Sequence, residues 1–148
     1  MSKRDILVID GDPKNLQILK ESLESSDFKV NAINDGIKAW ESILTNRPDV
    51  IVAEVDLPGM NGFRLLEKLQ KDPIASSIPL IFLTNRRGLE DRLKSLRSGV
   101  KDYMIKPLHV KEVVARINMI LKRLERTNVN ESFWVKKNVG KVEEKNFE

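Results

Sequence analysis

The sequence contains no cysteine and a single histidine, His109. The absence of cysteine excludes a disulfide framework, a thiolate metal site and a cysteine nucleophile, and one histidine excludes a zinc site built on a histidine pair. No apolar run approaches the roughly 20 residues of a membrane-spanning helix, and no signal-peptide core follows Met1. We therefore expect a soluble, cytoplasmic protein without a membrane partner.

The chain has 148 residues, 41% of them hydrophobic and 32% charged, which is the balance of a folded protein. This length leaves no room for a second substantial core and excludes a multidomain enzyme. We expect one domain over residues 1–126 and a polar C-terminal tail or linker over residues 127–148. Within that tail, residues 133–135 (Phe-Trp-Val) form the one apolar element, a candidate docking contact.

The net charge is +4, from 26 basic and 22 acidic residues. The excess lies within residues 1–126, where it is spread along the sequence, and no basic run with interleaved aromatic residues occurs. This pattern does not favour nucleic-acid binding, and we expect no nucleic-acid partner.

Short apolar runs alternate with stretches of helical periodicity. The first run, residues 6–9, is rich in β-branched residues, and Pro13 then suits the first turn of a helix. Strands are also expected over 28–33, 50–53, 79–83 and 102–105, with helices over 37–44, 62–69, 89–96 and from about 110. This alternation predicts a doubly wound α/β domain, a five-stranded parallel sheet with helices on both faces.

Polar side chains follow the strands at the carboxyl edge, where ligands bind in such sheets. They are Asp10 and Asp12, Glu54 and Asp56, Thr84, and Lys106. Carboxylate oxygens grouped in this way suit Mg²⁺, and a hydroxyl with an ammonium group can hold phosphoryl oxygens. The edge therefore predicts a site of the phosphoryl-transfer type.

Five motifs in order resemble the receiver domain of bacterial two-component response regulators, over residues 5 to 124. They are ILVIDGDP at 6–13, PDVIV at 48–52, LPGMNGF at 57–63, IPLIFLT at 78–84, and Gly99 through Asp102-Tyr103 to Lys106-Pro107. The resemblance implies the strand order 2-1-3-4-5. It also implies an aspartate that accepts a phosphoryl group from a histidine kinase with the help of Mg²⁺.

Two positions depart from the family pattern. The phosphorylated aspartate lies four residues before the proline of the Leu57-Pro58 motif, and that position holds Glu54. Gly11 replaces the second of two adjacent acids after the first strand, a direct metal ligand in the family. The added methylene moves the carboxylate by about 1 Å, a large error for in-line phosphoryl transfer.

From these departures we expect a degenerate receiver, a pseudo-receiver that is not an enzyme and that signals by protein contacts without phosphorylation. Its Mg²⁺ site, formed by Asp10, Glu54 and the backbone carbonyl of Asp56, is expected to be weak or absent because position 11 lacks an acid. The alternative is a competent Mg²⁺-dependent receiver that a histidine kinase phosphorylates, with Asp56 as the acceptor.

Several side chains of the edge have two interpretations. Glu54 can reach Lys106 and imitate part of the charge of a phosphorylated aspartate, or it can point into solvent. We expect Asp56 to be a loop carboxylate paired with Arg86, and Asp12 to cap the following helix.

Thr84 and Tyr103 match the pair whose hydroxyl and aromatic ring rearrange together when the family is activated. Alternatively, Thr84 only ends a strand and Tyr103 packs at a surface edge. The side-chain amide of Asn85 would crowd the entry to the site or hydrogen-bond to Glu54.

Receivers usually bind partners through the face of the fourth helix, fifth strand and fifth helix. Here that face is basic, with Arg92, Lys94, Arg97, Lys101, Lys111, Arg116 and Lys122. It would steer an acidic protein partner, or its charges are simply solvated. The apolar stripe of the last helix (113–124) is expected to pack on the sheet, and residues 120–124 could overhang and pair with a second copy.

Overall fold

The computed structural model describes residues 2–138, and the side chains of residues 2–126. The strands are β1 (Asp5–Ile9), β2 (Lys29–Ile33), β3 (Val50–Ala53), β4 (Leu80–Thr84) and β5 (Asp102–Ile105). The helices are α1 (Pro13–Ser25), α2 (Gly36–Thr45), α3 (Gly62–Lys71), α4 (Leu89–Arg97) and α5 (Val110–Asn138), with a short 3₁₀ turn at Ala75–Ser77. Apart from the end of α5, the predicted bounds differ from these by at most two residues.

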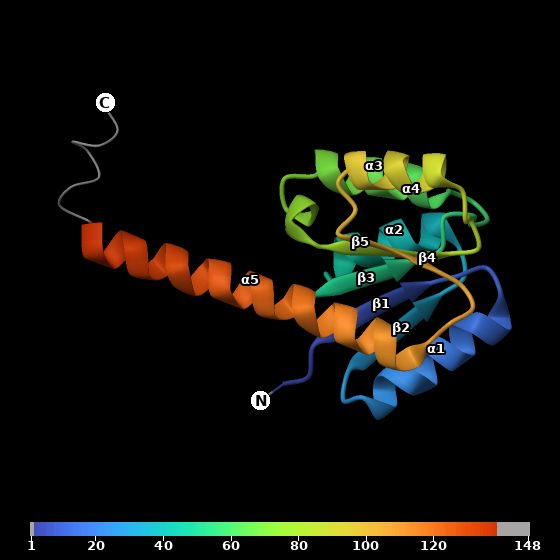
Figure 1. Cartoon of the computed structure of the whole chain (residues 1–148), viewed down its shortest axis with the longest axis horizontal. Helices are drawn as coiled ribbons and strands as arrows, with labels where there is room; N and C mark the ends of the chain where they lie inside the picture. Colours follow the sequence, from blue (N-terminus) through green and yellow to red (C-terminus); the bar gives the residue numbers. More distant parts are fainter. Residues whose placement is uncertain (1, 139–148) are drawn as a thin grey trace.

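The strands form one parallel sheet in the order β2-β1-β3-β4-β5, which confirms the predicted doubly wound fold. Helices α1 and α5 cover one face, and α2, α3 and α4 lie on the other (Figure 1). No helix within residues 2–138 has the length and apolar character needed to span a bilayer.

Each face of the sheet has its own hydrophobic core. Because successive side chains of a strand point to opposite faces, Leu7 and Ile9 pack under α2 and α3, whereas Ile6 and Val8 pack under α1 and α5. The central strand β3 is buried at every position. Burial on both faces explains why these strands read as continuous apolar runs.

The turn from β3 to α3 places the residues of the site and requires Gly62. A Cβ at this position would lie 2.8 Å from the Phe82 ring and 2.9 Å from the carbonyl oxygen of Glu54. The Gly62 N–H donates to the carbonyl oxygen of Val55, at 2.7 Å. The start of α3 is therefore held directly beneath the end of β3.

The polar tail or linker predicted from residue 127 begins as helix, because the backbone of residues 127–138 continues α5. The polar residues there do not stop the helix, because no proline or glycine occurs between Pro107 and Gly140 and extending a formed helix is easy. Figure 1 shows α5 running well past the edge of the sheet. The side chains of residues 133–135, the predicted docking element, lie outside the described residues, as do residues 139–148.

Candidate functional site

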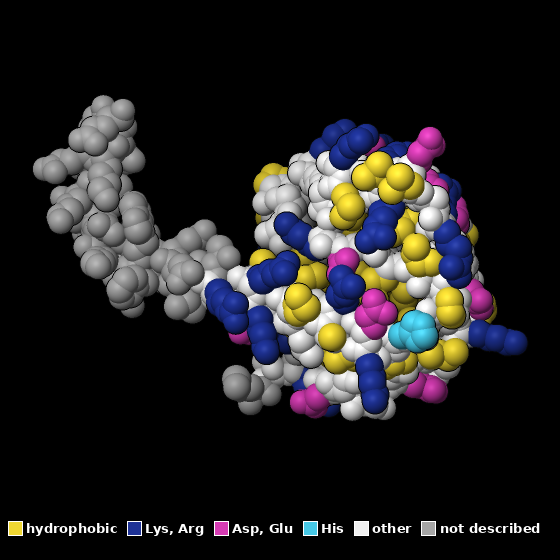
Figure 2. All heavy atoms as spheres, viewed as in Figure 1, with side chains coloured by type: hydrophobic (Ala, Val, Ile, Leu, Met, Phe, Trp, Pro, Cys, Tyr) yellow, Lys and Arg dark blue, Asp and Glu magenta, His cyan; other side chains and the backbone are white. Residues whose placement is uncertain are grey.

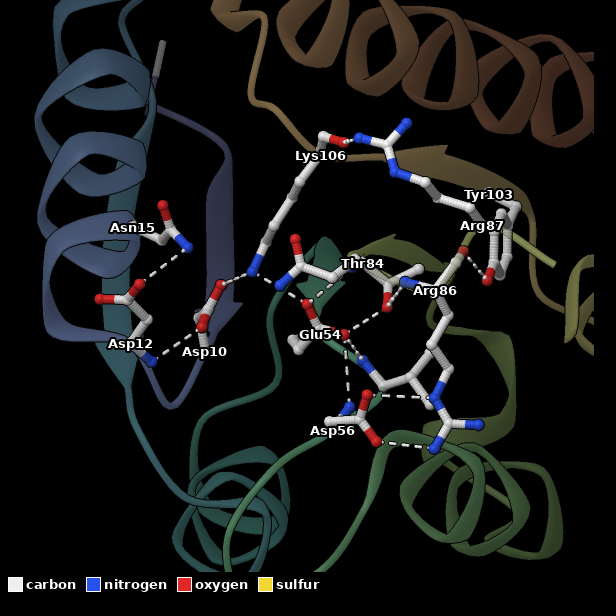
Figure 3. A network of polar contacts seen from close by, with 12 residues as sticks. Asp10, Asp12, Asn15, Glu54, Asp56, Thr84, Arg86, Arg87, Tyr103 and Lys106 are labelled. Carbon is white, nitrogen blue, oxygen red and sulfur yellow. Dashed lines mark hydrogen bonds and ion pairs between the residues drawn. The ribbon is translucent and has the colours of Figure 1, made fainter.

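Four of the side chains predicted for the carboxyl edge form one buried cluster. Asp10, Glu54, Thr84 and Lys106 come from the ends of β1, β3, β4 and β5, which are neighbours in the sheet. Each of the four is buried. Figure 3 shows Glu54 and Asp10 pointing toward the ammonium group of Lys106.

Glu54 points into the cluster rather than into solvent. Five donors converge on its carboxylate: the Thr84 hydroxyl, the Lys106 ammonium group, and the backbone N–H groups of Val55, Asp56 and Asn85. Lys106 Nζ lies 2.9 Å from Oε2, and the three backbone nitrogens lie 2.8–3.3 Å from a carboxylate oxygen. The predicted contact between Glu54 and Lys106 is confirmed.

Lys106 bridges two carboxylates. Its Nζ lies 2.6 Å from Oδ2 of Asp10 and 2.9 Å from Oε2 of Glu54. Burial by itself lowers the pKa of Lys106, but the hydrogen bonds and charges of the two carboxylates outweigh burial, so the pKa is raised above its ordinary value. The ammonium group is therefore charged at neutral pH.

Thr84 and Tyr103 are linked through the backbone of Arg86. The Thr84 hydroxyl accepts from the Arg86 N–H at 3.2 Å, and the Tyr103 hydroxyl donates to the Arg86 carbonyl at 2.7 Å. The Tyr103 ring is buried and packs edge-on against Phe82. Burial, together with the charge of Asp91, raises the pKa of the Tyr103 hydroxyl and keeps it a donor.

The side chain of Asp56 does not join the buried cluster. It forms the predicted pair with Arg86, whose Nε and Nη2 donate to its two oxygens at 3.0 and 2.7 Å. Arg86 also contacts Asp91 of α4 at 3.2 Å. The hydrogen bonds from Arg86 lower the pKa of Asp56. Arg86 therefore ties the loop after β3 to the start of α4.

Removing the charge of Asp56 is expected to have a small effect on stability. The side chains of Arg86 and Asp56 are 39% and 60% exposed, and exposed ion pairs contribute about 0–1 kcal/mol. Because the folded pKa of Asp56 is lowered, its contribution is present above the ordinary aspartate pKa and is lost as the pH falls through the lowered value. In urea unfolding, wild type and Asp56→Asn should differ by at most about 1 kcal/mol at pH 7 and by less at pH 3.

The matched control is Glu41→Gln, which neutralises an exposed acid in the middle of α2 and should leave the free energy of unfolding unchanged. A loss above about 2 kcal/mol in Asp56→Asn would contradict the assignment of this pair as a surface contact.

Other contacts separate what the sequence predicted from what it missed. Asp12 caps α1 by accepting from the Lys14 N–H at 2.9 Å, as expected. Asn85 contacts Glu54 through its backbone N–H, so the expected hydrogen bond from its side-chain amide is replaced.

The sequence analysis did not identify Arg87 as part of the site. Its guanidinium group donates a hydrogen bond to the Lys106 carbonyl at 2.7 Å. Two adjacent arginines at residues 86–87, separated from the end of β4 by one residue, were the available signal.

The carboxylate oxygens at this edge do not form a site that fits Mg²⁺, the cation that receiver domains bind at their phosphorylation site. Asp10 accepts from Lys106 and from the Asp12 N–H, both oxygens of Glu54 are engaged, and Gly11 offers no side chain. Within the part of the chain whose side chains are described, no group of three or more acids or histidines is placed to hold a metal ion. Mg²⁺ sites depend on several free oxygen ligands in octahedral array.

Comparison with known proteins gives consistent matches. The model of the response regulator receiver domain matches residues 6–118. The DNA-binding dual master transcriptional regulator RpaA of Synechocystis is 33% identical over 121 residues, covering 82% of this chain and 50% of that protein. The DNA-binding response regulator MtrA of Mycolicibacterium smegmatis is 36% identical over 123 residues, covering 83% of this chain and 53% of that protein.

Among solved structures, the receiver domain of the Francisella response regulator 1452 has a TM-score of 0.77 and 33% identity, covering 82% of this chain and 99% of that one. The chain thus spans about half the length of the curated relatives it matches and nearly all of this solved receiver domain.

Proposed function

The chain belongs to the response regulator receiver family, and from this membership we propose that it is a pseudo-receiver, which signals through protein contacts without being phosphorylated. One observation carries the proposal. The carboxylate of Glu54 already occupies both the Thr84 hydroxyl and the Lys106 ammonium group. Those are the two groups that would otherwise hold the oxygens of a phosphoryl group on an aspartate.

The added methylene of Glu54 is central to this proposal. It carries the negative charge outward from β3 to Thr84 and Lys106, and the backbone N–H groups of Val55, Asp56 and Asn85 complete the set of donors. Five donors together hold this carboxylate in one position. We propose that Glu54 in this way imitates part of the charge arrangement of a phosphorylated aspartate, without the action of a kinase.

The contacts of Thr84 and Tyr103, which we call the switch pair, support an active-like state. Thr84 is bonded to Glu54, and the Tyr103 ring is buried with its hydroxyl on the Arg86 carbonyl. In the family these two side chains rearrange together on activation. We propose that Glu54 holds both of them permanently in the engaged arrangement.

Phosphorylation is disfavoured at both candidate acceptors. The oxygens of Glu54 are fully engaged, and Mg²⁺ binding is proposed to be weak or absent because Gly11 supplies no ligand. Asp56, the alternative acceptor, is held by two hydrogen bonds from Arg86. We propose that this domain does not act as an enzyme.

The output is proposed to be a protein contact of the domain over residues 1–126, through α4, β5 and α5. The two relatives named above are called DNA-binding, and they are about twice as long as this chain. For the receiver domain itself we propose a protein partner rather than nucleic acid. Contact with a histidine kinase and pairing of two copies through the end of α5 stay predictions.

Glu54→Gln tests the proposal, because it keeps the length of the side chain and removes its charge. Lys106 keeps Asp10 as a partner, whereas Thr84 loses an ionised acceptor. Hydrogen bonds to charged groups contribute about 1.5–3 kcal/mol, and the free energy of unfolding should fall by about that amount. In NMR spectra, the amides of Thr84 and Asn85 and the ring protons of Tyr103 should shift.

Glu41→Gln serves again as the control and should leave these resonances in place. Unchanged signals of Thr84 and Tyr103 in Glu54→Gln would show that the charge of Glu54 does not hold the switch pair, and the proposal would fail.

A further inference from the structure

A groove with a volume of about 410 Å³ lies between α3 and α4. Phe63 and Leu66 of α3 and Lys94 of α4 are among the residues that line it. Leu66 is buried and the Phe63 ring is partly exposed, so the floor of the groove is apolar. We call this hollow the α3–α4 groove. It is separate from the buried cluster around Glu54, none of whose residues lines it.

Sparse packing of α4 leaves the α3–α4 groove open. The one buried residue of α4 is Ser95, whose hydroxyl donates to the Asp91 carbonyl within the helix. Its leucines point outward: Leu89, Leu93 and Leu96 are 69%, 38% and 47% exposed, and none of them lines the groove. Helix α4 therefore has no large apolar side chain with which to close the space toward α3.

Lys94 supplies the groove with a positive charge that no acid neutralises. Its ammonium nitrogen lies 4.2 Å from the centre of the Phe63 ring, and among residues 2–126 no ion pair involves it. Glu67, the acid in the wall of the groove, contacts Arg64 at 3.0 Å and Lys71 at 2.9 Å instead. The groove thus offers one free cation beside an aromatic ring, a setting for a ligand with one negative charge.

The part of the chain that builds the groove is positively charged as a whole. Residues 61–101, which form α3, β4 and α4, carry nine Lys and Arg against four Asp and Glu. Residues 1–60, by contrast, carry seven basic and eleven acidic residues. Figure 2 shows Lys and Arg side chains beside hydrophobic ones at the end of the molecule where α4 lies. The local field therefore favours an anion at the groove.

Three aromatic rings connect the groove to the switch pair. The Phe63 ring packs edge-on against Phe82 at 5.5 Å between ring centres, and Phe82 packs in the same way against Tyr103 at 6.3 Å. The guanidinium group of Arg86 lies 5.9 Å from the centre of the Phe63 ring, while its backbone bonds to both Thr84 and Tyr103. Because protein cores are close-packed, a displacement of Phe63 is transmitted to these neighbours.

We propose that the α3–α4 groove binds a small amphiphilic carboxylate, a molecule with one carboxylate group on an apolar body, and that the switch pair responds to its binding. The carboxylate pairs with Lys94, and the apolar body covers the Phe63 ring. The volume of the groove is within the range of small-molecule sites. This proposal rests on the proposed function and deepens it, because it gives a domain that is not phosphorylated a non-covalent input.

A larger hollow, of about 800 Å³ around Arg4, fits such a ligand less well. Its cations have acidic partners: Arg4 lies 3.7 Å from Asp49, and Lys29 lies 3.9 Å from Asp5. Its aromatic residue, Phe28, belongs to the core under α1 and α5, on the other face of the sheet from the Tyr103 ring. An anion there would compete with these acids and would not contact the rings that lead to the switch pair.

The test is an NMR titration of the full ¹⁵N-labelled chain with phenylbutyrate. Phenylbutyramide keeps the apolar body without the charge, and acetate keeps the charge without the body. We expect phenylbutyrate to shift the amides of Phe63, Leu66 and Lys94 and to bind about fivefold more tightly than the amide, the upper end of what an exposed ion pair supplies. Acetate should leave these amides in place, and added salt should weaken the binding of phenylbutyrate alone.

Variants of Lys94 test the carboxylate partner. Lys94→Gln should bind phenylbutyrate and phenylbutyramide equally, whereas Lys94→Arg should keep the preference for the acid. The control is Lys38→Gln, at an exposed lysine of α2, which should behave as wild type. Because the side chain of Lys94 is exposed, the amides of β1 should stay in place in every variant and show that the fold is intact.

The link to the switch pair has its own readout. At saturation with phenylbutyrate, the ring protons of Tyr103 and the amide of Thr84 should shift in the native chain. Phe63→Leu keeps an apolar side chain but removes the first ring, so the amide of Lys94 should still shift while the Tyr103 ring should not. Trp40→Leu, at a partly buried aromatic residue of α2, is the control and should leave both responses unchanged.

Three outcomes would overturn the proposal. Equal affinity of the native chain for phenylbutyrate and phenylbutyramide would remove the role of Lys94, and groove shifts without any change at Thr84 and Tyr103 would remove the link to the switch pair. A short peptide containing phenylalanine and glutamate that binds the groove more tightly than phenylbutyrate would assign it to a partner protein. None of these results alters the Glu54→Gln readout, and if that readout fails, the phenylbutyrate site stands and only the pseudo-receiver proposal falls.

Discussion

Lys106→Met is expected to lower the free energy of unfolding by about 3–5 kcal/mol at pH 7, the cost of removing one partner from a buried ion pair. Lys106 is 7% exposed and bonds to both Asp10 and Glu54. Methionine fills a similar volume but leaves two buried carboxylates without their cation. Chemical denaturation of wild type and variant measures the difference.

The pH dependence of this loss follows from the raised pKa of Lys106. The ammonium group contributes fully below the ordinary lysine value of 10.5, and its contribution is lost as the pH rises through the raised folded value. The gap between wild type and Lys106→Met should therefore stay constant from neutral pH to about pH 9 and narrow only in strong alkali. Lys38→Met, at an exposed lysine of α2, is the control, and a loss below about 1 kcal/mol in Lys106→Met would contradict the assigned role of the bridge.

Restoring the family residues at two positions is expected to create a phosphoacceptor. The double variant Gly11→Asp and Glu54→Asp should take up one phosphoryl group from acetyl phosphate in the presence of Mg²⁺, as measured by intact mass. A 1 Å misplacement costs on the order of 10²-fold in rate, so the double variant should react at least that much faster than wild type. A Cβ at position 11 would lie 3.1 Å from Cδ of Pro58, so the proline ring must move by only a few tenths of an ångström.

Single variants and Asp56 give the controls for this labelling. Glu54→Asp alone should react poorly, because position 11 still lacks the metal ligand. Label on the native chain that disappears in Asp56→Asn would identify Asp56 as the acceptor, and the pseudo-receiver proposal would then be wrong.

The fold and the composition of the site were largely predictable from the sequence. Buried parallel strands leave continuous apolar runs, and the carboxyl edge of a doubly wound sheet collects the residues that follow them. The order of the residues along the chain is therefore enough to group Asp10, Glu54, Thr84 and Lys106 at one edge. The pairing of Asp56 with Arg86 followed from their places after neighbouring strands.

Other features depend on information that side-chain identity does not carry. The N–H groups of Val55, Asp56 and Asn85 reach Glu54 only because of the backbone path after β3 and β4. The partner of the Tyr103 hydroxyl, the Arg86 carbonyl, is likewise a backbone group.

The orientation of α4 and the length of α5 escaped prediction for physical reasons of their own. An apolar stripe has the same periodicity whether it faces the sheet or solvent, so the outward leucines of α4 could not be recognised. The length of α5 was underestimated because polar composition was interpreted as loss of helix, although no helix breaker was present.

The most direct test of the pseudo-receiver proposal is the amide NMR spectrum of the native chain during addition of Mg²⁺ and then beryllofluoride, a mimic of an aspartyl phosphate. If Glu54 already stands in for the phosphorylated residue, the amides around Thr84 and Lys106 should not move in the native chain. The same additions should shift them in the variant with Gly11→Asp and Glu54→Asp. Shifts of these amides in the native chain would contradict the proposal and identify a phosphorylation switch with a working acceptor.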